Sequence, residues 1–148
     1  MSVESATNVN ELNPSYPANG DDRSEGAAHI RLVKTIMQTM SGLSITSKSA
    51  AYGFVLTDAN LAFLHPAADT TARTWTIPAN ASVAFPVGTT LTMINQHGAG
   101  VITIAITSDT MRLASAGTTG SRTLAADGIC TATKITSTEW LISGVALT

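Results

Sequence analysis

The spacing of apolar residues predicts strands over most of this chain. From residue 51 onward, apolar residues alternate with polar ones or form short runs, and turn-forming residues interrupt them at short intervals. Ile102, Ile104 and Ile106, for example, alternate with threonine and alanine, as in a strand with one face in a core. The predicted strands are 51–56, 61–65, 73–77, 82–85, 90–95, 101–107, 110–113, 121–125, 129–136 and 139–145. Many short strands separated by turns predict a mainly β domain of the β-sandwich or jelly-roll type.

A helical period is present between Glu25 and Met40. Ser24 can cap the first turn of this helix, and Gly42 can end it. Four apolar residues recur at helical spacing along one side: Ile30, Val33, Met37 and Met40. This side either packs against the rest of the protein or forms an adaptable docking surface, for which methionine is well suited. The pattern leaves both interpretations open.

The residues before this helix predict an extended arm. Pro14, Pro17 and Gly20 lie within residues 1–23, which show no apolar period. Proline restricts both itself and the preceding residue to extended geometry. The chain is therefore expected to divide into an extended arm plus one short helix, residues 1–48, and an all-β domain, residues 49–148.

The low content of charged residues limits the classes of function. The net charge is −2 and charged residues make up 12% of the chain, about half the usual share. This balance argues against binding to nucleic acid or to an anionic membrane, and no apolar run approaches the length of a membrane span. A chain with so few charges is expected to bury surface between copies of itself, although threonine hydroxyls could instead keep a monomer in solution.

The single cysteine and the N-terminal residues give two further expectations. Cys130 is a lone cysteine in a predicted strand, where it behaves as a small hydrophobe. The N-terminus lacks the basic and apolar regions of a signal peptide, so we expect synthesis in a cytosol.

The residues that could carry chemistry show no catalytic pattern. His29, His65 and His97 lack the spacing of a metal site. The carboxylates are scattered through predicted turns, where only the fold could bring two together as a glycosidase pair; they include Asp58, Asp69, Asp109, Asp127 and Glu139. We predict no catalytic, cofactor or metal site and no enzyme activity.

The tryptophans are the largest candidate core residues. Trp75 and Trp140 both lie in predicted strands. Trp75 could instead form a sugar-stacking platform with Tyr52 and Phe54. Because aromatic residues make up only 5% of the chain, a role in the core is favoured.

Residues 12–34 contain a motif that resembles a known class of proteins. It reads Leu-Asn-Pro-x-Tyr-Pro, then Arg-Ser-Glu-Gly, then His-Ile-Arg-Leu-Val-Lys. This stretch resembles the N-terminal segment of many tail-fibre and related virion proteins of tailed bacteriophages, and residues 75–89 and 94–104 are similar to β segments common in those proteins. The resemblance implies a virion-anchoring set made of Leu12, Asn13, Pro14, Tyr16, Pro17, Arg23, Glu25, His29, Ile30, Leu32 and Lys34.

The resemblance implies a structural function in the virion. The protein would be made in the cytoplasm of the bacterial host and would dock through its arm onto tail, portal-proximal or capsid proteins, as part of a tail fibre, appendage or collar. Fibre proteins of this kind imply a homo-oligomer, a trimer. A capsid decoration (cement) protein that uses the same arm is the alternative, and a glycan-binding module is a second one.

Overall fold

The computed structural model describes residues 6, 11–13, 23–39 and 42–148. The chain divides into two compact units, Met1–Ser44 and Ile45–Thr148. The first unit contains helix α1, and the strands found in the described residues belong to the second. Strand β1 (Ile45–Ser47) was not predicted, and it places the start of the sheet a few residues before the expected boundary at 48/49.

Helix α1 runs from Arg23 to Thr39, close to the range predicted from the apolar period. Glu25 lies in its first turn, where a carboxylate favours the positive end of the helix dipole. In the middle of the helix, Thr35 Oγ1 donates a hydrogen bond to the carbonyl oxygen of Arg31 at 3.0 Å, as a threonine facing solvent commonly does.

The predicted mainly β class with one helix is confirmed. In the described part of the chain, nine strands make one sheet. After β1 these are β2 (Tyr52–Gly53), β3 (Ala62–His65), β4 (Arg73–Ile77), β5 (Thr90–Asn95), β6 (Ile102–Ile106), β7 (Thr110–Leu113), β8 (Arg122–Lys134) and β9 (Glu139–Leu147), with a short 3-10 helix, η2 (Leu56–Asp58), between β2 and β3. The strands predicted at 73–77, 90–95 and 110–113 have the predicted bounds.

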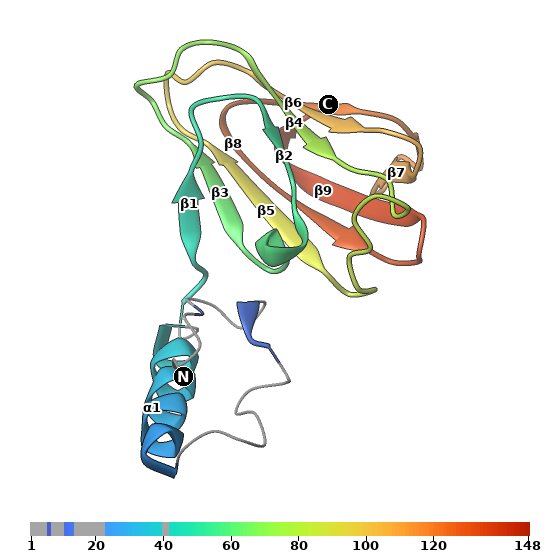
Figure 1. The fold of residues 1–148 in the computed structure, drawn as a ribbon. Helices are drawn as coiled ribbons and strands as arrows, with labels where there is room; N and C mark the ends of the chain where they lie inside the picture. The colour runs from blue at the N-terminus through green and yellow to red at the C-terminus, as the bar shows by residue number, and fades with distance from the viewer. Residues whose placement is uncertain (1–5, 7–10, 14–22, 40–41) are drawn as a thin grey trace. The chain divides into compact units, whose positions relative to one another are not determined.

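Strands β1 to β6 form two stacks within the sheet, and neighbouring strands of each stack run parallel. β1, β3 and β5 pair in parallel in one stack, and β2, β4 and β6 pair in parallel in the other. Because the chain visits the two stacks alternately, each pair of successive strands makes one coil, as in a short solenoid. β8 joins the stacks by antiparallel pairing with both β5 and β6, and β9 then pairs with β8 and β7. Figure 1 shows the resulting curled sheet.

Strand β8 continues through a predicted turn. Ala126, Asp127 and Gly128 were expected to separate two strands, and this prediction is wrong. They lie within β8, whose register with β9 shifts between Leu124 and Ile129. Asp127 has a φ of 60°, which aspartate tolerates better than most residues. These turn-forming residues therefore make a β-bulge, which bends one long strand so that it can pair with both stacks.

Two other strand predictions differ from the structure. Residues 82–85 form no strand, because Ser82 and Val83 both donate their backbone N–H groups to the carbonyl oxygen of Ala79 in a tight turn. The strand predicted at 51–56 is reduced to β2, since η2 begins at Leu56. Both segments are short and bounded by turn residues, where local apolar pattern is a weak guide.

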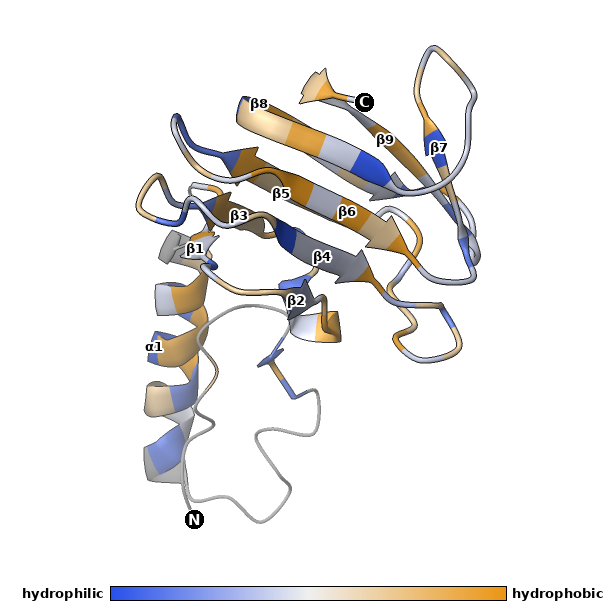
Figure 2. Ribbon diagram, turned by 90° about the horizontal axis from the view of Figure 1, so that it is seen from above, coloured by the Kyte–Doolittle hydropathy of each residue, from blue (hydrophilic) through white to orange (hydrophobic). Residues whose placement is uncertain are grey.

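The core lies between the two stacks. Alternate residues of β5 are buried, and β6 begins with the same alternation; Figure 2 shows apolar and polar colours alternating along β6. Trp75 and Trp140 are both fully buried, which confirms their predicted place in the core. Phe54 makes edge-to-face contacts with Phe63 and Trp75, at ring-centroid distances of 5.0 and 6.4 Å.

Replacing either tryptophan is expected to destabilise the second unit. Trp75→Ala or Trp140→Ala removes a fully buried ring and should lower the free energy of unfolding by about 3–5 kcal/mol. Chemical denaturation followed by circular dichroism measures this change. Denaturation midpoints equal to that of the unaltered protein for both variants would contradict the core assignment.

Candidate functional site

The anchoring residues predicted from the sequence are only partly described by the structure. Pro14, Tyr16 and Pro17 lie outside the described residues, while Leu12 and Asn13 lie inside them, and Arg23 begins α1. The remaining members share α1: Glu25, His29, Ile30, Leu32 and Lys34. Helix α1 therefore carries most of the described members of the anchoring set.

Helix α1 carries an exposed apolar stripe, formed by Ile30, Val33 and Met37. Their side chains are 58%, 41% and 66% exposed. The spacing of three and then four residues places them on one side of the helix. His29 and Ile36, which follow a neighbouring line, are buried instead. Among the described residues of the helix there is thus one buried line and one exposed apolar line.

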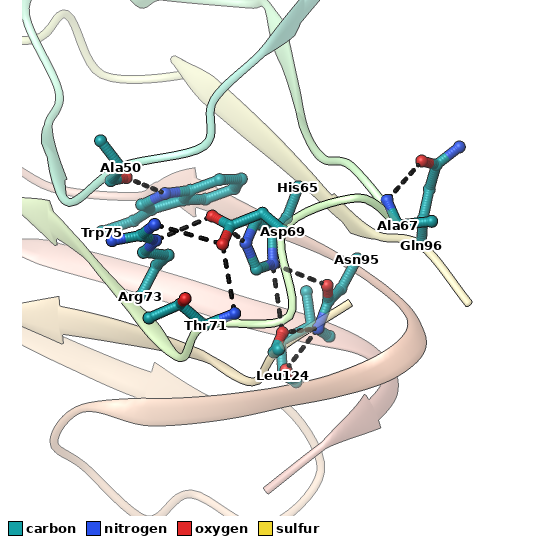
Figure 3. Close-up of polar contacts among 11 residues, drawn as sticks. Ala50, His65, Ala67, Asp69, Thr71, Arg73, Trp75, Asn95, Gln96 and Leu124 are labelled. Carbon is teal, nitrogen blue, oxygen red and sulfur yellow. Dashed lines mark hydrogen bonds and ion pairs between the residues drawn. The ribbon is translucent and has the colours of Figure 1, made fainter. Parts of the chain in front are cut away.

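The second unit contains a buried polar network at the ends of its coils (Figure 3). His65, at the end of β3, is fully buried. Its Nδ1 lies 3.0 Å from Asn95 Oδ1 and 3.1 Å from the carbonyl oxygen of Gly100. Asn95 Nδ2 donates to the carbonyl oxygens of Gly100 and Leu124, at 2.9 and 3.1 Å, which fixes the orientation of the amide. The network therefore connects β3, β5, β8 and the loop before β6.

Asp69 completes the network on the other side of the imidazole. Its Oδ2 lies 3.0 Å from His65 Nε2 and accepts a hydrogen bond from Arg73 Nε at 2.8 Å. Its Oδ1 accepts from the backbone N–H of Thr71 at 3.1 Å. The hydrogen bond from Arg73 is the main reason why the pKa of Asp69 lies well below its usual range, and the contact with His65 adds to this effect. The same pairing raises the pKa of Arg73.

Gly100 allows the loops around this network to approach closely. A Cβ atom at this position would lie 2.3 Å from the carbonyl oxygen of Thr71, a distance that real side chains do not adopt. The backbone N–H of Gly100 also donates to the carbonyl oxygen of Asp69 at 3.0 Å. The loop before β4 and the loop before β6 are thus held together by a backbone contact that requires glycine.

A second polar contact inside the sheet involves a buried lysine. Lys134, at the end of β8, is 1% exposed, and its Nζ donates to Asn80 Oδ1 at 2.5 Å. The same Nζ lies 5.6 Å from the centre of the Trp140 ring, within the range of a cation–π contact. The backbone N–H of Asn80 in turn donates to Asp109 Oδ2 at 3.0 Å. Lys134 therefore holds the loop after β4 against the end of β8.

The candidate carboxylates bind separate structural partners. Asp58 accepts hydrogen bonds from the Tyr52 hydroxyl and the Val55 backbone, each at 2.8 Å. Burial and this carboxylate raise the pKa of Tyr52 to about 12. The other pairs are Asp69 with Arg73, Asp109 with the Asn80 backbone, Asp127 with His97, and Glu139 with Arg112. The contacts that these side chains make are those of turns and strand ends rather than of an acid–base pair.

The sugar-stacking platform and a metal site can both be tested against the positions of the side chains. Trp75 and Phe54 are buried, so the sugar-stacking platform proposed for them with Tyr52 is not formed. Burial raises the pKa of the Cys130 thiol to about 12, as expected for a cysteine that packs as an apolar residue. Within residues 6, 11–13, 23–39 and 42–148, histidine, cysteine and carboxylate side chains form no group of three that could bind a metal ion.

Comparison with models of known protein families found no match, and comparison with curated protein sequences found none either. In the described part of the chain, no helix combines the length and the apolar character needed to cross a membrane. The resemblance to phage virion proteins consequently stays a prediction from the sequence motifs.

The polar network was missed by reasoning from the sequence, although a signal for it exists. The predicted strand 61–65 places His65 at a strand end, and Asp69 lies in a predicted turn, which indicates no contact between them. His65 continues the inward-facing positions of β3 after Phe63, and Asn95 continues those of β5 after Met93. A polar residue in phase with buried apolar ones predicts a buried hydrogen-bonded group.

The Asp69 carboxylate is expected to make stability depend on pH. Its pKa is lower in the folded protein than in the unfolded chain, so its stabilising effect is present above the ordinary aspartate pKa and is lost as the pH falls towards the folded value. Asp69→Asn should therefore lower the unfolding temperature at neutral pH, and the difference from the unaltered protein should shrink between about pH 5 and about pH 2.5. Thermal unfolding at a series of pH values measures it.

Asp127→Asn is the matched control for this experiment. Asp127 pairs with His97 at 2.9 Å, but both side chains are largely exposed, and such pairs contribute little to stability. Its unfolding temperature should remain close to that of the unaltered protein throughout. If Asp69→Asn and Asp127→Asn behave alike, the buried network does not have the role assigned to it.

Proposed function

We propose that this protein is a structural component of a bacteriophage virion, a tail-fibre, appendage or collar protein that docks onto other virion proteins through its N-terminal unit. The observation that carries the proposal is the exposed stripe of α1, Ile30, Val33 and Met37. Apolar side chains on successive turns of one helix face are the pattern of a helix that packs into a groove of a partner. The stripe lies within the stretch whose motif resembles the virion-anchoring segment.

The composition of the stripe suits an adaptable contact. Met37 has an unbranched, polarisable side chain that fits irregular surfaces. Lys34 is exposed beside the stripe and provides a polar edge to it. These features favour the docking interpretation of the helix over packing against its own protein.

The second unit supports a structural rather than a catalytic role. Its carboxylates are engaged with turn backbones, arginines, a tyrosine and histidines, and its buried polar groups connect loops and strands. A network of this kind stabilises one arrangement of the coils, which is useful in a protein that must persist outside a cell. We propose that the protein is not an enzyme and that it assembles as a homo-oligomer, with three chains as the resemblance implies.

Charges introduced into the stripe should prevent incorporation into particles. We expect Met37→Lys or Ile30→Lys to abolish or strongly reduce the amount of this protein in purified phage particles, because a charge would be buried in the docking contact. Quantitative mass spectrometry of the particles measures the amount. Since these side chains are exposed, the variants should have the same unfolding temperature as the unaltered protein.

Thr35→Lys is the control on the opposite exposed side of α1. It adds the same charge to the same helix and should be incorporated normally. Normal incorporation of Met37→Lys and Ile30→Lys would show that the stripe is not the docking surface.

The number of copies per particle distinguishes a tail or collar protein from a capsid decoration protein. Both would use the same docking helix, so the geometry of α1 does not separate them. We expect a copy number comparable to that of tail components. A copy number comparable to that of the major capsid protein, obtained by imaging intact particles, would favour the decoration alternative.

A further inference from the structure

Lys134 is a buried lysine without a counter-ion. Its side chain is 1% exposed, and it takes part in none of the ion pairs that the described residues form. The hydrogen bond of its Nζ goes to the side-chain oxygen of Asn80, which carries no charge. An ammonium group that leaves water for a neutral partner loses its hydration without gaining an opposite charge, which is costly. The contact is therefore unfavourable for as long as Lys134 remains an ammonium ion.

The amine of Lys134 lies unusually close to the amide of Asn80. Nζ and Oδ1 are 2.5 Å apart, below the usual range of about 2.7–3.2 Å for a hydrogen bond between nitrogen and oxygen. Because Oδ1 is bonded to the carbonyl carbon Cγ, the nucleophilic nitrogen of the lysine lies next to an electrophilic carbon. An amine and a carboxamide in this position can form a new amide and release ammonia. The contact therefore brings together the two groups that a lysine–asparagine isopeptide bond joins.

Backbone hydrogen bonds hold both residues in place. The backbone N–H of Lys134 donates to the carbonyl oxygen of Thr89, and its carbonyl oxygen accepts from the N–H of Gly88, each at 2.8 Å. The backbone N–H of Asn80 donates to Asp109 Oδ2 at 3.0 Å. Two groups that are fixed in contact react far faster than the same groups free in solution. The fold thus supplies the positioning that this slow reaction needs.

The surroundings exclude water and supply a carboxylate. Lys134 Nζ lies 5.6 Å from the centre of the Trp140 ring, and this ring packs edge to face against Phe85 at a centroid distance of 5.6 Å. Both aromatic side chains are buried, so water is kept from competing with the amine. Asp109, which is hydrogen-bonded to Asn80, is the carboxylate that can accept a proton from the amine and return it to the leaving nitrogen.

We propose that Lys134 and Asn80 form an isopeptide bond within the chain. The uncharged amine attacks Cγ of Asn80, the bond between Nζ and Cγ forms, and the bond between Cγ and Nδ2 breaks with its electron pair on Nδ2. One proton passes from Nζ to Nδ2, which leaves as ammonia, so no oxidant, reductant or other reactant is needed. The product is one neutral amide that ties the loop after β4 to the end of β8. The inference concerns the second unit and does not depend on the proposed function.

The mass of the purified full-length protein tests the proposal. We expect the intact chain to be lighter than its sequence requires by one molecule of ammonia. Because an asparagine elsewhere can also lose ammonia by cyclising, trypsin digestion of the denatured protein must locate the change. Trypsin should not cleave after Lys134, and a branched peptide should join the segments that contain Asn80 and Lys134. Lys48 is the internal control: its Nζ lies 3.8 Å from the centre of the Tyr52 ring, a similar aromatic contact, and trypsin should cleave after it.

Three variants examine the reacting groups. Lys134→Arg and Asn80→Ala each remove one of them, so both should have the masses that their sequences require and should unfold at lower temperature, because a covalent link that closes a loop is lost. Asp109→Asn keeps an acceptor for the Asn80 backbone but cannot carry the proton, so the cross-linked fraction should fall. An unchanged fraction would overturn the part assigned to Asp109. Cleavage of the unaltered protein after Lys134, or loss of ammonia from the Lys134→Arg variant as well, would overturn the isopeptide bond.

Discussion

Strand β8 is the element on which the rest of the second unit depends. Two stacks of three short parallel strands have open edges, and buried backbone groups that lack hydrogen bonds are costly. β8 pairs through residues 122–124 with β6 and through residues 128–133 with β5, so a single strand covers one edge of each stack. The bulge around Asp127 makes this possible, because it bends the strand between its two pairings. β9 then covers the remaining side of β8.

The polar network provides hydrogen-bond partners for backbone groups of the loops, as β8 does for backbone groups of the strands. Solenoid-like coils must turn sharply between stacks, and each turn leaves backbone carbonyl groups near the interior. His65 and Asn95 bind the carbonyl oxygens of Gly100 and Leu124, and Asp69 binds Arg73 and the imidazole from the other side. Every polar group named here has a hydrogen-bond partner, so the network costs little to bury and favours one arrangement of the loops.

The surface of the protein follows from its low charge. Few charged residues are available to cover the sheet, and threonine takes their place on both outward faces. Among the described residues, large apolar side chains remain exposed in the stripe of α1 and at scattered positions of the second unit, which include Val55, Leu56 and Val87.

The sequence by itself determined the local elements and the composition of the surfaces. The apolar periods predict α1 and most strands, and β4, β5 and β7 have the predicted bounds, because periods of 3.6 and 2 follow from backbone geometry alone. The burial of Trp75 and Trp140 could also be predicted, since large apolar residues in strands are seldom left in water. The tertiary structure decided which strands are neighbours. Parallel pairing across 17 to 30 residues (Ile45 with Ala62, Ala62 with Thr92) depends on long-range contacts that leave no mark on local spacing. It also decided that residues 126–128 form a bulge rather than a turn, and that His65, Asp69 and Asn95 meet in one network, because only the curled sheet brings the ends of β3 and β5 and the loop before β4 together.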